Sequence, residues 1–261
     1  MNQMTTADLV HSETTDGMTT LTLLNGKAHP LSLAMITALH EAVTTASQDD
    51  ATRVLILHGP GHIFCAGHDL KEISRHRDDD DSGEAFLTRL FEACAAMMQA
   101  ITNCPKPTIA RVEGIATAAG LQIVAACDLA FATDAATFCL PGVRNGGFCT
   151  TPAVTVSRAV GRKHLMELLL TGAPKDAAWA LRAGLINEVK PASEIAAHVN
   201  DLAHAMTAYN LGPIAAGKAC TNAHLDMDIA SAYDSATEVM VSHFMDPDRI
   251  AHEARSRWKA N

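Results

Sequence analysis

The positions of apolar residues along the first part of the chain follow the periods of strands and helices in turn. Val10 to Leu24 holds two short strand candidates on either side of Asp16-Gly17, a pair typical of tight hairpin turns. From Leu31 to Ser47 the apolar side chains recur at the spacing of a helix face. The run from Arg53 to His58 is rich in β-branched residues and leucine, which predicts a further strand.

This alternation continues through the middle of the chain. A charged, turn-rich segment from Arg75 to Gly83 precedes a helical spacing of apolar residues, at Phe86, Leu90, Cys94 and Met97. Besides a helix after Ala118, the pattern predicts three more strands, at Thr108 to Val112, Asp128 to Ala132 and Ala136 to Cys139. Helical spacing dominates after Gly161, so we expect the sheet to end before that residue.

The composition favours a packed globular protein. Of the 261 residues, 48% are hydrophobic, which is ample material for a core. A formal net charge of -9 argues against a nucleic-acid-binding surface, although it leaves room for a local basic patch that binds phosphates. The acidic run from Asp78 to Asp81 is expected in a solvated loop, because consecutive carboxylates do not by themselves converge on one metal ion.

The cysteines and the first residues give expectations about the compartment. Seven cysteines without a C-x-x-C pair are poor material for a complete disulfide framework, so we expect reduced thiols. Met1 to Asp8 is polar and lacks the basic and apolar parts of a leader, and no apolar run reaches the length of a membrane span. These features predict a cytoplasmic protein that binds neither a membrane nor nucleic acid.

The stretch from Val112 to Gln122 carries the first candidate chemistry. An extended apolar run breaks into the small residues Ala118-Ala119-Gly120 and then resumes with helical spacing, so a strand meets the start of a helix. The first amides of a helix have no partner within it, and small side chains let a carbonyl oxygen approach them. The pattern predicts half of an oxyanion hole. The alternative is merely close packing of a helix on a sheet.

A second segment, Phe64-Cys65-Ala66-Gly67-His68-Asp69, is a candidate for the other half. Two backbone donors aimed at one thioester oxygen would stabilise the negative charge of an enolate; the alternative is that Ala66-Gly67 is only a tight turn. Together the two segments resemble motifs of the crotonase superfamily, the enoyl-CoA hydratase/isomerase family. Those motifs read roughly F-x-A-G-x-D and N-G-x-A-x-G-G-G, followed by a C-D pair, which is Cys127-Asp128 here.

Further matches extend the resemblance from about Leu21 to about Pro191. They are Pro105-Lys106-Pro107, Ala159-Val160-Gly161, Leu170-Thr171-Gly172 and Ala183-Gly184-Leu185-Ile186. The resemblance implies an α/β fold, a crotonase-type spiral of strand-strand-helix turns with a C-terminal helical region. It assigns residues 1–190 to a core with an acyl-CoA site and residues 191–261 to capping and oligomerisation. The helices from Ile229 to Trp258 would then serve a homotrimer or a dimer of trimers.

The resemblance also assigns catalytic positions. The backbone amides of Ala66 and Ala119 take the place of the family's oxyanion hole. Family hydratases carry two glutamates, whose positions hold Gln122 and Gly142 here. Neither residue exchanges a proton as a carboxylate does, so we expect simple hydration of an enoyl thioester to be weak. Gln122 could orient water or a polar acyl group, or be an ordinary helix residue. Gly142 could form a turn or leave room for a larger acyl group.

Polar residues near the two motifs are candidates for substrate binding. His68 would lie near the thioester and titrate near neutral pH, unless its side chain points away. Lys71 is a candidate for a coenzyme A phosphate, or else a solvated lysine. Cys65 and Asp69 complete this group, although the resemblance treats Asp69, like Asp128, as mainly structural.

A loop further along the chain, Arg144 to Thr151, faces the acyl end of the site in relatives. Arg144 or Asn145 could hold a carboxylate or bicarbonate, and Thr150 could bind water; the alternative for each is an ordinary loop role. Cys149 has no activating base in its local sequence, which favours an idle thiol over a nucleophile.

The leading hypothesis is an acyl-CoA enzyme, a lyase or isomerase of fatty acid metabolism, that stabilises a thioester enolate in a backbone oxyanion hole. The rival is a non-catalytic homologue that binds acyl-CoA. The sequence holds neither a convincing cluster of metal ligands nor a dinucleotide fingerprint. We therefore expect no metal and no cofactor beyond coenzyme A as part of the substrate.

Overall fold

The structure is a computed structural model that describes residues 9–255, so Trp258 and the polar start Met1 to Asp8 lie outside the described residues. Contacts divide the chain into two compact units, which meet in the sequence between Tyr209 and Asn210. The expected boundary after residue 190 would place helix α9 (Ile195–Thr207) outside the first unit. By its contacts, α9 belongs to the first unit.

The larger of two sheets in the first unit has six strands in the order β1-β2-β3-β5-β7-β10. Its strands are β1 (Val10–Thr15), β2 (Met18–Leu23), β3 (Val54–His58), β5 (Thr108–Val112), β7 (Leu129–Thr133) and β10 (Glu188–Lys190). Only the β1–β2 pair is antiparallel. Asp16 and Gly17 turn this hairpin with φ of 50° and 81°, as the sequence predicts.

A second sheet of four short strands is interleaved with the first along the chain. Its order is β4-β6-β8-β9, with strands β4 (Ile63–Cys65), β6 (Ile115–Thr117), β8 (Thr137–Cys139) and β9 (Lys175–Asp176). Along the chain, β3 is followed by β4, β5 by β6 and β7 by β8, and helical structure follows each of these pairs. This rhythm is the expected spiral of strand-strand-helix turns.

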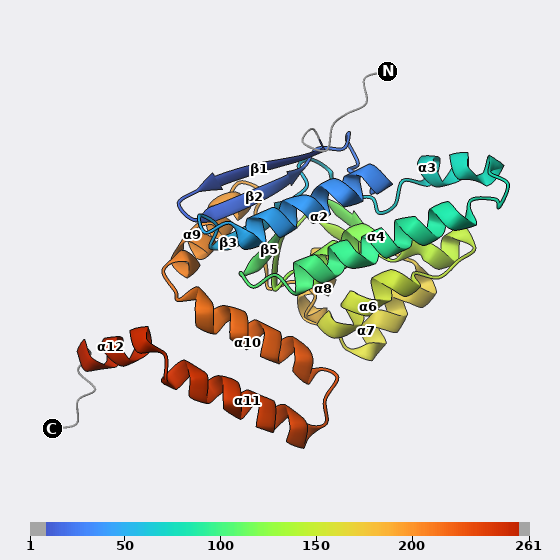
Figure 1. Ribbon diagram of the computed structural model, residues 1–261. Coiled ribbons are helices and arrows are strands. Elements are labelled where there is room, and N and C mark those ends of the chain that lie inside the picture. Colours follow the sequence, from blue (N-terminus) through green and yellow to red (C-terminus); the bar gives the residue numbers. More distant parts are fainter. Residues whose placement is uncertain (1–8, 256–261) are drawn as a thin grey trace. The chain divides into compact units, whose positions relative to one another are not determined.

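Helices cover both faces of the large sheet (Figure 1). Val54 and Ile56 of β3 pack in one cluster with residues of α9, whereas Leu55 and Leu57 join the main core. The main core also holds the apolar faces of α2 (Leu33–Gln48) and α4 (Glu84–Thr102), which lie side by side. All five residues of β3 are buried, as a parallel strand between two layers requires.

A buried lysine ties α2 to the start of β5. Lys106 is 7% exposed, and its Nζ donates hydrogen bonds to the carbonyl oxygens of Ala46 (2.9 Å) and Asp49 (2.5 Å) at the end of α2. A cation at this place satisfies carbonyls that the helix leaves without partners and complements its dipole. The Pro105-Lys106-Pro107 motif thus has a structural explanation.

The remaining helical segments belong to both units. The first unit adds α3 (Leu70–Arg75), η1 (His76–Asp78), α5 (Ala119–Ala126), η2 (Pro141–Asn145), α6 (Thr150–Ala159), α7 (Arg162–Thr171) and α8 (Ala177–Ala183). The second unit contains α10 (Leu211–His224), α11 (Ile229–Phe244) and α12 (Pro247–Arg255). Of the described helices, none combines the length and apolar character that crossing a membrane requires.

The expectation that the sheets end before Gly161 is wrong. Strand β10 pairs in parallel with β7 at the edge of the large sheet, and β9 pairs with β8 in the small one. Both strands are only two or three residues long and mostly charged, Lys175-Asp176 and Glu188-Val189-Lys190. Such short edge segments carry no alternation that a sequence pattern can detect.

Candidate active site

The start of helix α5 presents a backbone amide at the junction with β6. Ala119 is the first residue of α5 and is fully buried. The residue before it, Ala118, has φ of 51°; its N–H donates to the carbonyl of Cys139 (2.9 Å), and its carbonyl accepts from Gln122 (3.1 Å). The helix therefore begins abruptly, and it offers the Ala119 N–H no acceptor of its own.

Two glycines allow the β4–α3 connection to approach this amide closely. A Cβ built on Gly67 would lie 3.1 Å from the Ala119 nitrogen and 2.8 Å from the Ala118 Cβ. A Cβ built on Gly120 would lie 2.1 Å from the carbonyl oxygen of Cys65. Any side chain at position 67 would thus fill the space in front of the Ala119 amide.

The assignment of Ala66 as the second oxyanion donor is corrected by the structure. The Ala66 N–H donates to the carbonyl oxygen of Ala28 at 3.0 Å, so that amide already has an acceptor. The next contacts form a parallel bridge in which Leu31 donates to the Gly67 carbonyl (2.8 Å) and accepts from Asp69 (3.1 Å). In such a bridge the amide of the intervening residue, His68, points to the opposite side.

His68, rather than Ala66, is therefore the candidate for the second donor beside Ala119. Its side chain packs edge-on against Phe91 of α4, with ring centroids 5.0 Å apart. Burial lowers the pKa of His68 to about 4, so the imidazole is neutral at pH 7. Its Nε2 atom is buried and finds no hydrogen-bond partner among the described residues.

Gln122 is the polar residue of α5 nearest to these amides in sequence. It is 3% exposed, and its backbone carbonyl accepts from the Thr155 hydroxyl at 3.2 Å. The side-chain Oε1 is buried and finds no partner among the described residues. The Gln122 Oε1 atom can therefore accept a hydrogen bond that no described residue donates.

Gly142 lies in a tight turn that closes on its own loop. Its carbonyl accepts from Gly147 (2.9 Å), and its N–H donates to the Cys149 Sγ (3.2 Å). A Cβ on Gly142 would lie 2.7 Å from the Cys149 nitrogen and 2.9 Å from the Phe148 carbonyl carbon. Gly142 thus forms a turn and does not leave room for a larger acyl group, because the neighbouring backbone fills the space that a side chain would need.

The cysteines beside these segments are poor nucleophiles. Burial raises the pKa of Cys65 to about 12, and its Sγ donates to the carbonyl oxygen of His29 at 3.2 Å. Burial also raises the pKa of Cys149. Both groups stay protonated near neutral pH. All seven cysteines lie within the described residues and are free, as expected.

The remaining sequence candidates have other contacts. The Asp69 carboxylate caps α3 by accepting from the amides of Lys71 (2.9 Å) and Glu72 (3.2 Å), and the Lys71 side chain is exposed. Arg144 is exposed and donates from Nε to the carbonyl of Thr171 at the end of α7 (3.3 Å). Thr150 is exposed at the start of α6. None of these contacts places the side chain of Lys71, Arg144 or Thr150 beside the amides of His68 and Ala119.

Asp128 has the structural role that the resemblance implies. Its carboxylate accepts from the backbone N–H (2.7 Å) and the hydroxyl (2.9 Å) of Thr108, at the start of β5. In return, the Thr108 hydroxyl accepts from the Asp128 N–H at 2.9 Å. These bonds fix β7 beside β5.

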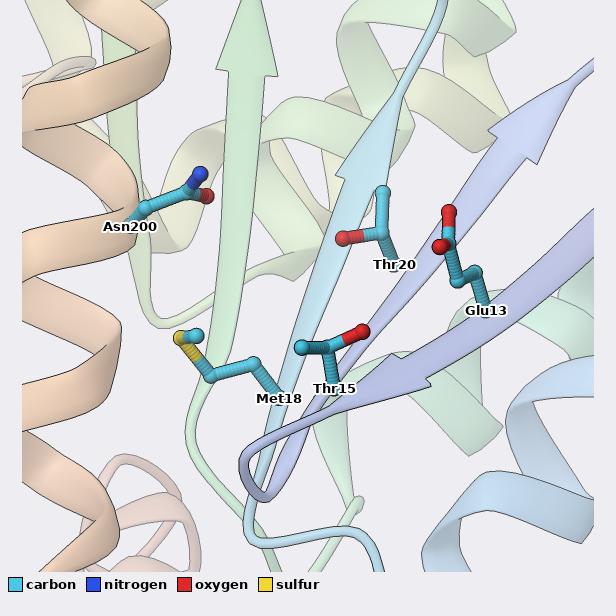
Figure 2. A pocket seen from close by; sticks show the side chains of 5 residues that line it. All are labelled: Glu13, Thr15, Met18, Thr20 and Asn200. Atoms are coloured by element: carbon cyan, nitrogen blue, oxygen red, sulfur yellow. The ribbon is translucent and has the colours of Figure 1, made fainter.

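A separate surface pocket of about 260 Å³ lies on the side of the sheet that α9 covers. Figure 2 shows Glu13 and Thr15 from β1, Met18 and Thr20 from β2, and Asn200 from α9 around it. Its lining includes none of the residues that surround the Ala119 amide. Across residues 9–255, no three His, Cys, Asp or Glu side chains gather as metal ligands do.

The sequence model of the family described as enoyl-CoA hydratase/isomerase matches residues 13–258 of this chain. The chain belongs to the enoyl-CoA hydratase/isomerase family. Relatives include mouse (Mus musculus) enoyl-CoA hydratase domain-containing protein 3, mitochondrial, which is 38% identical over 229 residues, or 87% of this chain and 75% of that protein.

Solved structures of the enoyl-CoA hydratase/isomerase family share the fold. A family protein from Silicibacter pomeroyi is 58% identical, with a TM-score of 0.87 over 92% of this chain and 100% of the other. Human enoyl-CoA hydratase domain-containing protein 3 is 35% identical, with a TM-score of 0.86 over 92% of this chain and 94% of the other. These comparisons confirm the crotonase-type α/β fold and identify an acyl-CoA protein of the crotonase type.

The expectation of a cytoplasmic protein is contradicted by the names of these relatives. Enoyl-CoA hydratase domain-containing protein 3 is described as mitochondrial in mouse, rat and human. The expectation rested on the cysteine spacing, the polar composition of Met1 to Asp8 and the lack of an apolar run of membrane length. The folded part of a protein has the same physical requirements in either compartment. The composition therefore could not decide the location.

Proposed function

We propose that this protein binds an acyl-CoA thioester with its carbonyl oxygen between the backbone amides of His68 and Ala119. The close approach of Gly67 to the Ala119 nitrogen is the observation that carries the proposal, because it leaves a space that fits an oxygen but not a side chain. In this proposal both amides point to that space, and the dipole of α5 adds positive potential there. The pair would stabilise the charge of an enolate.

The reaction that fits the surrounding groups is not simple hydration. Two-glutamate hydratases need a carboxylate pair, and Gln122 and Gly142 hold those positions here. Each general acid or base contributes about 10²- to 10⁴-fold, so the loss of both leaves little hydratase activity. We infer a lyase or isomerase of the enoyl-CoA hydratase/isomerase type, in which a group of the substrate or water takes up the proton that leaves the α-carbon and returns it, as a glutamate does elsewhere.

The test deletes the Ala119 donor while keeping the helix. Proline is well tolerated at the first position of a helix, where its missing N–H has no intrahelical partner, so Ala119→Pro removes the proposed donor without removing a bond of α5. Because Ala118 before it has φ of 51° and ψ of -119°, circular dichroism checks that the variant is folded. Turnover of an acyl-CoA panel should fall by about 10²- to 10³-fold. Arg162→Pro, at the exposed first position of α7, is the matched control and should keep full activity.

Two results would contradict the proposed oxyanion site. Full turnover by a folded Ala119→Pro variant would exclude that amide as a donor. A ligand-bound structure with the thioester oxygen far from both His68 and Ala119 would exclude the pair.

A second candidate function is acyl-CoA binding without catalysis. It is favoured by the amide side chain of Gln122, which cannot exchange a proton as a carboxylate does. The two functions differ in turnover, so an acyl-CoA panel is measured both for consumption of thioester and for equilibrium binding. A binding protein holds its ligand unchanged, whereas an enzyme consumes at least one thioester.

The second compact unit is the proposed means of assembly. Large apolar side chains of α11 and of the residue after it are strongly exposed: Ile229 is 77%, Tyr233 70% and Met245 66% exposed. Exposed apolar clusters of this kind mark contact surfaces. We expect a homotrimer or a dimer of trimers, and light scattering at micromolar concentration measures it. A stable monomer would refute this assembly and leave the oxyanion proposal untouched.

A further inference from the structure

The side chain of Gln122 holds an unused hydrogen-bond acceptor inside the proposed acyl-CoA site. Gln122 is only 3% exposed, and its Oε1 atom is buried without a hydrogen-bond partner among the described residues. A buried polar atom without a partner is costly, and natural proteins keep few of them. Such an atom beside a binding site is explained when the ligand supplies the missing partner.

The geometry of α5 directs this side chain toward the amides. Ala119 and Gln122 lie three residues apart in α5, so their side chains are neighbours on one face of its first turn. Gly67 approaches the same turn, since a Cβ there would lie 3.1 Å from the Ala119 nitrogen. Helical side chains lean toward the N-terminus, so Gln122 covers the turn that carries the Ala119 amide.

The neighbouring imidazole limits the charge of the acyl group. Burial holds the pKa of His68 at about 4, so its side chain offers no cation at neutral pH. Arg144, the candidate for holding an acyl carboxylate, instead donates to the Thr171 carbonyl. The His68 imidazole and the Gln122 amide are therefore neutral dipoles, which suit a neutral polar acyl group.

We infer that Gln122 selects acyl-CoA thioesters that carry a hydroxyl on one of the first two carbons beyond the thioester carbonyl. The hydroxyl donates to Gln122 Oε1 while the carbonyl oxygen accepts from His68 and Ala119. The inference rests on the proposed function, because it places the ligand by its thioester oxygen. It makes Gln122 a determinant of specificity rather than a proton-transfer group.

Calorimetric binding to butyryl-CoA, 2-hydroxybutyryl-CoA and 3-hydroxybutyryl-CoA tests the inference. The wild type should bind at least one hydroxyacyl thioester about tenfold or more tightly than butyryl-CoA, because butyryl-CoA leaves Oε1 unpaired. Gln122→Leu, of similar size, should lose that preference while binding butyryl-CoA at least as well. Gln99→Leu, at an exposed position of α4, is the matched control and should bind all three ligands as the wild type does.

The outcomes separate the inference from the proposed function. Equal wild-type affinities for the three thioesters overturn the inference and leave acyl-CoA binding intact. A hydroxyl preference that persists in Gln122→Leu also overturns it, because another group then recognises the hydroxyl. Absence of binding to all three overturns the proposed function itself. Gln122→Met repeats the test if the leucine variant does not fold, as judged by circular dichroism.

Discussion

Replacement of Gly67 by alanine tests the oxyanion geometry with a single methyl group. The added Cβ would stand 3.1 Å from the Ala119 nitrogen and 2.8 Å from the Ala118 Cβ, whereas carbon contacts normally need about 3.5–4.0 Å. The methyl group would therefore occupy the position proposed for the thioester oxygen. Gly67 also has φ of 81°, which adds backbone strain to the same substitution.

The two effects of Gly67→Ala have different magnitudes and different readouts. A left-handed backbone costs an alanine about 1–2 kcal/mol, which lowers stability but leaves a folded site able to react. Loss of one oxyanion donor costs about 3–4 kcal/mol in the transition state, or about 10²- to 10³-fold in kcat. Turnover of the best acyl-CoA substrate should therefore fall much further than thermal stability does.

Two other glycines provide the controls. Gly61 has φ of 90° but open space around a built Cβ, so Gly61→Ala reports backbone strain alone. Gly161 also has open space, with φ of -63°, so Gly161→Ala should be nearly silent. Both variants should keep wild-type turnover. Full activity of a folded Gly67→Ala protein, or an equal loss in Gly61→Ala, would refute the reasoning.

Two further predictions follow from positions 122 and 142 and from the buried histidines. Gln122→Glu alone should leave hydration of crotonyl-CoA near the low rate expected of the wild type. Adding Gly142→Glu should not restore a hydratase, because overpacking against Cys149 should destabilise the fold by about 1–3 kcal/mol. Rapid hydration of crotonyl-CoA by the double variant would contradict this prediction. Burial lowers the pKa values of His58 and His68 to about 4 from 6.5, so the unfolded chain binds the extra protons and the stability present above pH 6.5 is lost progressively toward pH 4. At pH 5, about 1.5 pH units below the ordinary pKa, each histidine should lower the free energy of unfolding by about 2 kcal/mol. Urea unfolding at pH 7 and pH 5 measures this loss, which should be about 2 kcal/mol smaller in His68→Phe than in the wild type. An equal loss in both proteins would contradict the prediction.

The sequence predicts the elements whose periodicity is strong. The spacing of apolar residues in α2 and α4 and the β-branched run of β3 correspond to continuous buried faces, which leave a clear signal. Strands β9 and β10 leave none, because their positions in the sheets depend on pairing with β8 and β7 rather than on their own apolar residues. Tertiary pairing decides such short segments.

The same distinction separates the two halves of the proposed site. Ala119 follows from local sequence, because a strand that breaks into small residues before a helix exposes the first helical amide. The other donor does not, since successive amides of an extended segment point to opposite sides. The bonds of Ala66 to Ala28 and of Gly67 and Asp69 to Leu31 move the candidate donor from Ala66 to His68.

Neutral groups at the proposed site limit how it can act on a thioester. Backbone amides and the dipole of α5 attract a developing oxyanion without needing a counter-charge, and a neutral His68 neither competes for that charge nor repels a neutral acyl group. Gln122, in place of a carboxylate, is neutral and does not raise the energy of an enolate beside it. The arrangement therefore favours formation of the enolate while leaving proton delivery to substrate or water, which is why the reaction must differ from that of a two-glutamate hydratase.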